Sequence, residues 1–393
     1  MKKLYYENPY LQEFDARVEG CTPVKNGFAV TLDQTAFYPE GGGQPCDIGT
    51  LDCANVTDVQ DVDGQIIHTC DCALPVGATV HGKIDWARRF DLMQQHSGEH
   101  LVSGVVHARF GYDNVGFHMG SDVITIDFSG ILTREQLAAV ERTVNEAIWQ
   151  NLPCEITYLD RNAPVFYRSK KELTGEVRLV RFPGMDLCAC CGTHVRQTGE
   201  IGLVKLLSCV KFHDGVRVEM LCGKRAYEYL SKIVEQNHRI SGLISAKPDQ
   251  TAQEVERILA EQRQTKYQLV GCQNELLQVK AQALSGRGNV LCFENDLSGD
   301  LLRRFADAVM HQCGGICAVF SGSDAAGYHY AIGQLDGDVR ALVKSLNAAL
   351  SGRGGGKPAF AQGAVSATRS EIAAFFAEYG MNVTAQQGAN YAG

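Results

Sequence analysis

The first 88 residues contain short runs in which apolar and polar positions alternate, as in residues 28–32, 56–59 and 65–68. A period of two is typical of β-strands that bury one face, and the glycines and Asp-Gly pairs between the runs indicate turns. The run Gly41-Gly42-Gly43-Gln44-Pro45 interrupts the pattern. Glycines let a backbone approach closely and leave amide donors for a ligand. We predict a small β-barrel over residues 1–88.

From residue 89 to residue 222 the pattern predicts helices and strands together. Apolar residues at helical spacing indicate a helix over residues 87–110, and an alternating strand follows at 123–128. Thr133, with Gln136 three residues later, forms a capping box that opens the next helix. Further strands are expected at 155–159, 176–182, 201–210 and 215–221. These elements predict a domain with helices packed on a mostly antiparallel sheet.

A 3-4 spacing of mostly apolar residues between Val255 and Ala283 predicts a helical stalk over residues 223–286. Gly242 and Pro248 separate it from an earlier helix near residues 226–240, so the pattern favours a stalk or an antiparallel hairpin with that helix over a long dimeric coiled coil. Alternating strand and helix patterns over residues 287–393 predict a small α/β domain. We therefore expect a multidomain α+β protein with an N-terminal β-barrel, a central α+β domain, a helical stalk and a C-terminal α/β domain.

Composition narrows the class of protein. A hydrophobic fraction of 45% and a charged fraction of 21% are ordinary for a globular chain. No apolar stretch approaches the ~18 residues of a membrane span, and the first residues lack a signal-peptide core. We therefore expect a cytoplasmic protein without a membrane partner. Its 15 cysteines then indicate reduced thiols and metal ligation rather than a disulfide framework.

The charge balance bears on nucleic-acid binding. The chain has 37 basic and 45 acidic side chains and a net charge of −8, which argues against indiscriminate nucleic-acid binding but allows an RNA partner. Phosphate contacts need only a local basic surface, and a solvated charged face is the alternative reading. The candidate cluster consists of Arg161, Arg168, Lys170, Lys171, Arg178 and Arg181.

Two short pairs of metal-binding residues carry the most specific chemistry. His96 and His100 are four residues apart on the predicted helix, so both imidazoles project from one face and can reach one ion. Cys190 and His194 lie in a glycine-bearing turn and can complete a tetrahedral set of nitrogen and sulfur donors. We predict a Zn²⁺ site on these four residues. Four satisfied core residues are the alternative.

A second glycine-rich segment, Gly352 to Pro358, lies between two predicted helices of the last domain. It lacks the Lys-Ser or Lys-Thr ending of a Walker A loop. Its glycines, with two flanking basic residues, form a candidate anion cradle for a phosphodiester, and a structural loop is the alternative. The residues of this candidate RNA-binding loop are Arg353, Gly354, Gly355, Gly356 and Lys357.

The order of these motifs resembles the long form of the alanyl-tRNA editing proteins of the AlaX group, relatives of the editing region of alanyl-tRNA synthetase. The matching motifs are Gly41 to Pro45, the His96 and His100 pair, the Cys190 and His194 pair, and Gly352 to Pro358 followed by Ala361-Gln362-Gly363. The resemblance covers the full length. The last motif is similar to the C-terminal domain that alanyl-tRNA synthetase shares with DHH phosphoesterases.

The resemblance implies a trans-editing hydrolase that cleaves the ester of tRNA(Ala) mischarged with serine or glycine at a zinc site. It also implies an amino-acid pocket that includes Gly42, Gly43, Gln44 and His118. The ion would either activate a water or orient the aminoacyl adenosine, and the sequence leaves both routes open. A homodimer through the stalk or the C-terminal domain is compatible with this assignment.

Two rival functions stay open at the level of sequence. His96-Ser97-Gly98-Glu99-His100 also fits the inverted zincin pattern, in which Glu99 is the general base of a metallopeptidase and Glu176 a candidate third ligand. That reading leaves Cys190 and both glycine-rich segments unexplained. In the other rival, zinc only stabilises a tRNA-binding module without catalysis.

Overall fold

The structure is a computed structural model that describes residues 1–160, 166–169 and 176–383. The chain divides into two compact units, Met1–Gly242 and Leu243–Gly393. Both units combine helices and sheets, which confirms the multidomain α+β class. The finer division at residues 88, 222 and 286 stays a prediction.

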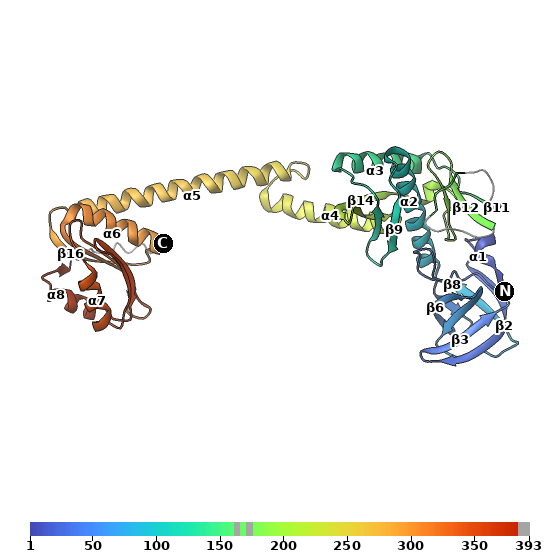
Figure 1. Ribbon diagram of the computed structural model, residues 1–393, viewed down its shortest axis with the longest axis horizontal. Helices are drawn as coiled ribbons and strands as arrows, with labels where there is room; N and C mark the ends of the chain where they lie inside the picture. The colour runs from blue at the N-terminus through green and yellow to red at the C-terminus, as the bar shows by residue number, and fades with distance from the viewer. Residues whose placement is uncertain (161–165, 170–175, 384–393) are drawn as a thin grey trace. The chain divides into compact units, whose positions relative to one another are not determined.

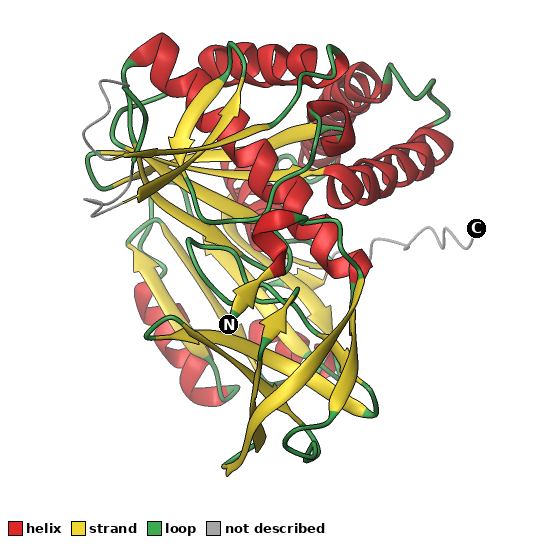
Figure 2. Ribbon diagram, turned by 90° about the vertical axis from the view of Figure 1, so that its right-hand side faces the viewer, coloured by secondary structure: helices red, strands yellow, loops and turns green. Residues whose placement is uncertain are grey.

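The N-terminal part of the first unit is a closed barrel with strand order β2-β3-β7-β6-β5-β8. Its strands are β2 (Glu13–Val24), β3 (Gly27–Leu32), β5 (Gly49–Leu51), β6 (Ala54–Val62), β7 (Gln65–Cys70) and β8 (Thr79–Ile84). Alternate residues of β2 such as Phe14, Ala16 and Val18 are buried, which is the period of two of a strand with one buried face. Beside the barrel lie α1 (Leu4–Glu7) and a two-stranded parallel pair of β1 (Lys2–Lys3) and β4 (Gln34–Thr35). Figure 2 shows the curled barrel strands in yellow.

The rest of the first unit is built on two antiparallel sheets and the long helix α2 (Trp86–Phe110). The four-stranded sheet has the order β14-β15-β10-β9, and the three-stranded sheet has the order β11-β12-β13. The strands are β9 (Asn114–Met119), β10 (Ile124–Phe128), β11 (Glu155–Asp160), β12 (Glu176–Phe182), β13 (Asp186–Ala189), β14 (Val204–Phe212) and β15 (Gly215–Cys222). Helix α2 runs from the barrel to a position between the two sheets and contacts both of them (Figure 1).

The remaining helices of this unit are α3 (Arg134–Trp149), the short η1 (Thr198–Ile201) and α4 (Gly223–Ile244). Helix α3 opens with the predicted capping box, because Thr133 and Gln136 each accept a hydrogen bond from the other's backbone amide. Its apolar stripe, including Val140 and Val144, packs in one core with α2 and the four-stranded sheet. That shared core holds α2 rigidly along its length.

The second unit has a mixed six-stranded sheet with the order β19-β20-β18-β17-β16-β21. Its strands are β16 (Gly288–Glu294), β17 (Gly314–Ser323), β18 (Gly327–Gly333), β19 (Arg353–Lys357), β20 (Phe360–Val365) and β21 (Asn382–Val383). Its helices are α5 (Thr251–Gln282), α6 (Gly299–Cys313), α7 (Arg340–Ala349) and α8 (Arg369–Ala377). No helix among the residues that the structure describes is long and apolar enough to cross a membrane.

The glycine-rich segment of the second unit is a correction to the expected loop. Residues Arg353–Lys357 form β19, an edge strand that pairs antiparallel with β20, and all five residues are exposed. Glycine has a low intrinsic strand propensity, but Cβ atoms at Gly354 and Gly356 would lie within 2.5 Å of β20 backbone atoms. Close approach to a neighbouring strand therefore explains two of these glycines.

Candidate metal centre and adjoining cavity

Helix α2 supplies the first pair of predicted ligands. Asp85 caps its N-terminus by accepting a hydrogen bond from the Arg88 backbone amide, and Gly111 ends it in a left-handed conformation. Within this uninterrupted helix His96 and His100 lie on one face, with ring centroids 5.3 Å apart. Each residue is only 2% exposed. The helix alone thus places two imidazoles side by side in the interior.

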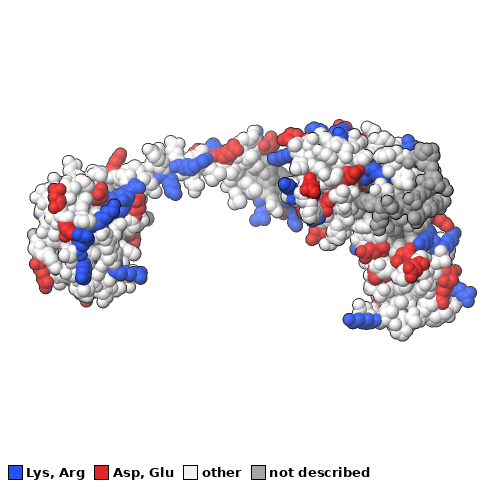
Figure 3. Space-filling model, in the orientation of Figure 1, with Lys and Arg blue, Asp and Glu red and all other residues white. Residues whose placement is uncertain are grey.

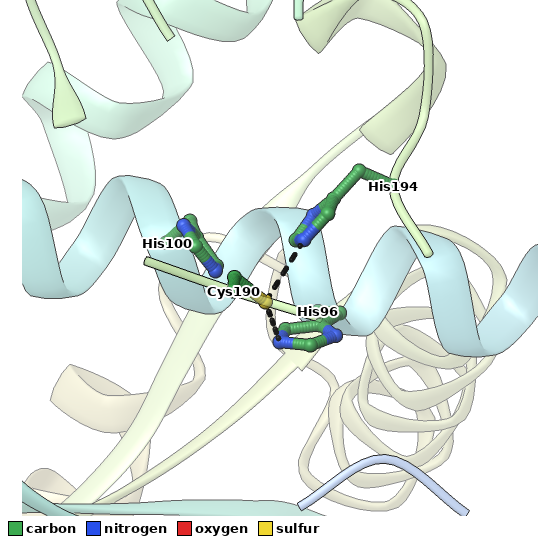
Figure 4. A group of neighbouring side chains, drawn as sticks. All are labelled: His96, His100, Cys190 and His194. Carbon is green, nitrogen blue, oxygen red and sulfur yellow. Dashed lines mark hydrogen bonds between the residues drawn. The ribbon is translucent and has the colours of Figure 1, made fainter. Parts of the chain in front are cut away.

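The turn after β13 brings the second pair to the same point. Cys190 Sγ lies 3.5 Å from His96 Nε2 and 3.4 Å from His194 Nε2. Figure 4 shows these side chains converging with His100, and one donor atom from each of the four lies within 4.8 Å of all the others. Three imidazole nitrogens and one thiolate form a donor set that suits a tetrahedral zinc ion.

The outward nitrogen of each histidine has a buried partner. His96 Nδ1 donates to Gln44 Oε1 at 2.9 Å, and His100 Nδ1 donates to Asp186 Oδ2 at 2.9 Å. His194 Nδ1 pairs with Ser97 Oγ at 3.2 Å. Partners of this kind fix the ring orientation and direct Nε2 towards the centre of the cluster, as in metal sites. The residues present therefore fit a bound metal.

Burial and mutual proximity shift the pKa values of the cluster residues. Burial and the neighbouring His96 lower the pKa of His194 to about 3. Burial disfavours the charged form of His100, but the hydrogen bonds and negative charges of Asp186 and Cys190 together outweigh it and raise the pKa of His100 to about 9. Burial also opposes the Cys190 thiolate, yet the surrounding imidazoles hold the pKa of Cys190 well below its usual range. Metal binding at such a site is coupled to proton release.

The nearby thiols are distinct from Cys190. Cys188 is buried and belongs to a second group with His100 and Asp186, and burial raises its pKa far above the ordinary value. Cys191 is exposed. A thiolate is the form that ligates metals, so Cys190 is the thiol best suited to the site.

Close packing sets the shape of the turn. A Cβ on Gly192 would lie 2.1 Å from His96 Cε1, so only glycine allows the turn to approach the ring this closely. Arg178 Nη1 donates to the Cys190 carbonyl at 2.7 Å and to the Gly192 carbonyl at 3.1 Å. The buried guanidinium thereby holds the two carbonyls of the turn together.

A cavity of about 420 Å³ adjoins the cluster. Its lining includes His96, His100 and Cys190 from the cluster and Gly42 and Gly43 from the barrel segment. Additional lining residues are Glu99, Val115, Gly116, Phe117, Arg168, Ser169, Cys188, Ala189 and Cys191. The volume is in the range of small-molecule sites, and the position next to ligand-type side chains makes this the candidate reaction site.

The predicted pocket residues are only partly where we expected them. Gly42 and Gly43 line the cavity, whereas Gln44 is buried behind His96. The Gln44 side-chain amide donates to Thr193 Oγ1 and accepts from the Thr193 backbone amide. His118 is exposed on β9 and is not among the described lining residues. Its neighbour Phe117 lines the cavity and stacks on the His96 ring at 5.5 Å. Successive residues of a strand face opposite sides, so Phe117 and His118 point to opposite faces of β9, and a role for His118 in the pocket stays a prediction.

The structure also reassigns much of the predicted basic cluster. Arg168 forms an ion pair with Asp186 through two hydrogen bonds of 2.7 and 2.8 Å, and Arg178 is buried at the turn. Arg181 pairs with Glu155 on the surface. Arg161, Lys170 and Lys171 lie outside the described residues. Arg168 and Arg178 are thus internal supports of the site rather than an RNA-facing surface.

Two residues that hold side chains of the site in place, Asp186 and Asn114, were not predicted from the sequence. Asp186 orients His100, and Asn114 bonds Glu99 at the cavity. The sequence carried a signal for Asp186 alone, because it lies four residues before Cys190. Nothing local distinguished Asn114, which only the folding of β9 against α2 brings to the site.

Two family models match the chain. The model for tRNA synthetases class II (A) matches residues 9–88, and the model for the threonyl and alanyl tRNA synthetase second additional domain matches residues 177–219. The first match contains the barrel strands. The second contains the turn that bears Cys190 and His194.

Similar curated proteins are alanine–tRNA ligases. The chain is 32% identical over 390 residues to that of Natronomonas pharaonis, which covers 92% of this chain and 42% of the relative. It is 31% identical over 390 residues to that of Pyrobaculum arsenaticum, covering 93% of this chain and 43% of the relative. The chain thus spans about two fifths of the length of these relatives. It is an AlaX-like relative of the alanyl-tRNA synthetases.

Proposed function

We propose that the protein is a zinc-dependent deacylase that acts in trans on tRNA(Ala) mischarged with serine or glycine and hydrolyses the aminoacyl ester. The observation that carries the proposal is the cluster of His96, His100, Cys190 and His194 beside the cavity, in a chain related to alanine–tRNA ligases. Both the donor set and its position next to a small-molecule cavity support ester hydrolysis.

The need for such an activity has a physical basis. A synthetase pocket that accepts the methyl group of alanine discriminates poorly against an isostere with one added hydroxyl, and also against the smaller glycine. A difference of one methylene is worth only about 1–3 kcal/mol in such a pocket. A second site that selects for what alanine lacks is the usual remedy, and this cavity is the proposed second site.

The chain's own residues perform the binding and orientation in this proposal. His96, His100, Cys190 and His194 would hold the zinc ion, which supplies Lewis acidity towards an ester carbonyl or a water when bound. Phe117 forms an apolar wall beside His96, and Gly43 approaches it closely, since a Cβ there would lie 2.6 Å from the Phe117 ring. This packing limits the room for bulk water next to the ester.

We also propose that β19 contacts the tRNA backbone. Arg353 and Lys357 are exposed at its two ends, and the three glycines between them leave the backbone accessible. Acidic and basic side chains are interspersed over the face seen in Figure 3, so phosphate binding requires local rather than global positive charge. Arg353 and Lys357 supply that local positive charge on the exposed strand.

The test is deacylation of Ser-tRNA(Ala), Gly-tRNA(Ala) and Ala-tRNA(Ala) by the zinc-loaded protein. We expect fast release of serine or glycine and slow release of alanine. A His96→Ala/His100→Ala variant should lose both bound zinc and deacylation. A His213→Ala variant is the matched control, because His213 is an exposed histidine in the turn between β14 and β15, outside the cavity, and it should retain both.

The same assay separates the rival functions. Tight tRNA binding with no release of any amino acid would replace the proposal with the zinc-stabilised binding module. Cleavage of peptides with intact aminoacyl-tRNA would favour the metallopeptidase. Cys190 and His194 join His96 in the cluster, which the peptidase reading leaves without a role.

A further inference from the structure

An exposed aromatic side chain, Phe166, lies near the cavity. Phenylalanine is among the residue types that are most often fully buried, yet Phe166 is 82% exposed. Two residues later Arg168 lines the cavity, and Ser169 lines it too. A chain advances by at most about 3.6 Å per residue, so the Phe166 backbone lies within about 7 Å of that of Arg168.

Helix α2 gives the Phe166 ring its position. The ring lies against that of His107, with ring centroids 6.2 Å apart and an angle of 21° between the ring planes. His107 comes seven residues after His100, so it lies on the same face of α2, about 10 Å further along the helix. His107 Nδ1 also lies 3.1 Å from Asp113 Oδ1, directly before β9, and residues 115–117 of β9 line the cavity. The Phe166 ring is therefore close to two elements, α2 and β9, that form walls of the cavity.

The Phe166 ring has open surface for a ligand. His107 is its aromatic neighbour among the described residues, and most of the ring remains in contact with solvent. Val115 lines the cavity and is itself 66% exposed, which adds apolar surface at the opening. Covering an exposed aromatic ring removes apolar surface from water, and stacking of a second ring adds to that gain. A flat, uncharged ring is therefore the ligand group that Phe166 favours.

The substrate of the proposed reaction has such a ring. The amino acid of a charged tRNA is esterified to the ribose of the terminal adenosine, so a single sugar separates the ester carbonyl from the adenine base. A carbonyl placed beside the metal cluster leaves the base at the opening of the cavity. Proteins that bind single-stranded nucleic acids stack bases on exposed aromatic side chains of this kind.

We infer that Phe166 stacks on the adenine base of the terminal adenosine and thereby holds the aminoacyl ester in the cavity. This inference rests on the proposed function. Stacking recognises the flat face of a base and not its hydrogen-bonding edge, so Phe166 supplies affinity without reading the base. The contact is the same in the ground state and in the transition state, so it lowers KM and leaves kcat unchanged.

The experiment compares two seryl amides that cannot be hydrolysed as esters. One is adenosine with an amide-linked serine in place of the 3′-hydroxyl, and in the other a hydrogen atom also replaces the adenine base. Calorimetry should show that the zinc-loaded wild-type protein binds the adenosine compound about 5- to 150-fold more tightly. A Phe166→Leu variant keeps an apolar side chain but has no flat ring, so it should bind both compounds about equally. A Phe166→Trp variant should retain the wild-type preference.

Controls distinguish stacking from a structural role. A damaged cavity would weaken both compounds alike, so the ratio of the two affinities isolates the contribution of the base. Tyr267→Leu is the matched control, because Tyr267 is also 82% exposed but lies on α5 in the second unit, and it should keep the wild-type ratio. A base preference that survives in Phe166→Leu would overturn the inference, and so would equal binding of the two compounds by the wild type.

Turnover of Ser-tRNA(Ala) separates this inference from the proposed function. Phe166→Leu should raise KM about 5-fold or more and leave kcat unchanged. If the wild type releases no amino acid from any charged tRNA but prefers the adenosine compound through Phe166, the deacylase proposal is wrong and stacking is supported. If the wild type releases serine and Phe166→Leu keeps the wild-type KM and base preference, editing stands and the inference about Phe166 is wrong.

Discussion

His100 Nδ1 donates a hydrogen bond of 2.9 Å to Asp186 Oδ2, and both residues are buried. Asp186 lies at the start of β13, four residues before Cys190, and also accepts two hydrogen bonds from Arg168. Burial raises the cost of ionising Asp186, but the bonds from His100 and Arg168 hold its pKa below the ordinary value. A single carboxylate thus connects the helical half of the cluster to the strand that leads into the turn.

Removing the Asp186 charge should weaken metal binding. In Asp186→Asn the His100 ring loses its anionic partner and Arg168 loses the carboxylate that accepts its two hydrogen bonds, so we expect zinc affinity to fall about 10- to 100-fold. Competition with a chromogenic chelator measures this. Asp127→Asn is the control, because Asp127 pairs with Arg217 in the four-stranded sheet away from the cluster. Equal affinities for the two variants would contradict the role of Asp186.

Gly192→Ala should displace the His96 ring. The added Cβ would lie 2.1 Å from His96 Cε1, so either the turn or the ring must move. We expect loss of zinc binding with the fold retained, measured by metal content and circular dichroism. Gly271→Ala on α5, where a Cβ meets nothing within 4 Å, should bind zinc as the wild type does. A fully zinc-loaded Gly192→Ala protein would show that the turn does not need this close approach.

The barrel should lose stability below neutral pH because of His68. This residue is fully buried, accepts a hydrogen bond from Thr35 Oγ1 and donates one to the Val30 carbonyl. Burial lowers the pKa of His68 from 6.5 to about 4. As pH falls from about 6.5 to about 4, His68 is protonated in the unfolded chain but stays neutral in the folded protein. The free energy of unfolding therefore falls by up to about 3 kcal/mol over this range.

Urea unfolding at pH 7 and pH 4.5 tests this contribution. His68→Gln cannot titrate, so its stability should change less between the two pH values than that of the wild type. His81→Gln replaces an exposed barrel histidine and should not flatten the pH dependence. Identical pH dependence in the wild type and His68→Gln would refute the prediction.

The β19 proposal predicts a specific change in tRNA binding. Arg353→Ala and Lys357→Ala should each raise KM for charged tRNA and leave kcat unchanged, because they remove phosphate contacts that are remote from the ester. Each should also reduce the slope of log affinity against log salt by about 1. Arg303→Ala on α6 removes an exposed arginine that pairs with Asp300 and should change neither quantity. An unchanged salt slope in both β19 variants would remove this strand from the tRNA interface.

Helix α5 carries a row of exposed apolar residues, and we propose that this row is the contact of the homodimer that the sequence allows. Leu269, Leu276 and Val279 are 56%, 57% and 64% exposed and follow the 3-4 spacing of the predicted stalk. A second copy of the chain would cover this row. Leu276→Glu should shift the protein from dimer to monomer in sedimentation velocity. A wild-type protein that sediments as a monomer at micromolar concentration would exclude the dimer.

Features set by neighbours along the chain were predictable from sequence. Helical periodicity placed His96 and His100 on one face of α2, and the Thr133 capping box marked the start of α3. Barrel strands such as β3 and β7 were recognisable from the alternation of polar and apolar residues. These patterns act within a few residues, where backbone geometry alone fixes which side chains share a face.

Other features depended on which elements pack together. The glycine-rich segment became strand β19 because β20 pairs with it. Arg168 and Arg178 turned inward because buried acceptors, Asp186 and the carbonyls of the Cys190 turn, lie within reach of them. The register of β9 with β10 decided that Phe117 lines the cavity and that His118 lies on the opposite face of the strand. A change of one position in register moves a side chain to the opposite face.

The sequence by itself determined the donor chemistry: two imidazoles one helical turn apart, and a thiol and a third imidazole in one turn. Only the tertiary structure decided that these pairs meet, that Asp186 and Gln44 orient the rings, and that Glu99 faces the same cavity. The physical reason is that donor type and local spacing are properties of neighbouring residues. Convergence of segments about ninety positions apart requires the packing of α2 between two sheets and the barrel.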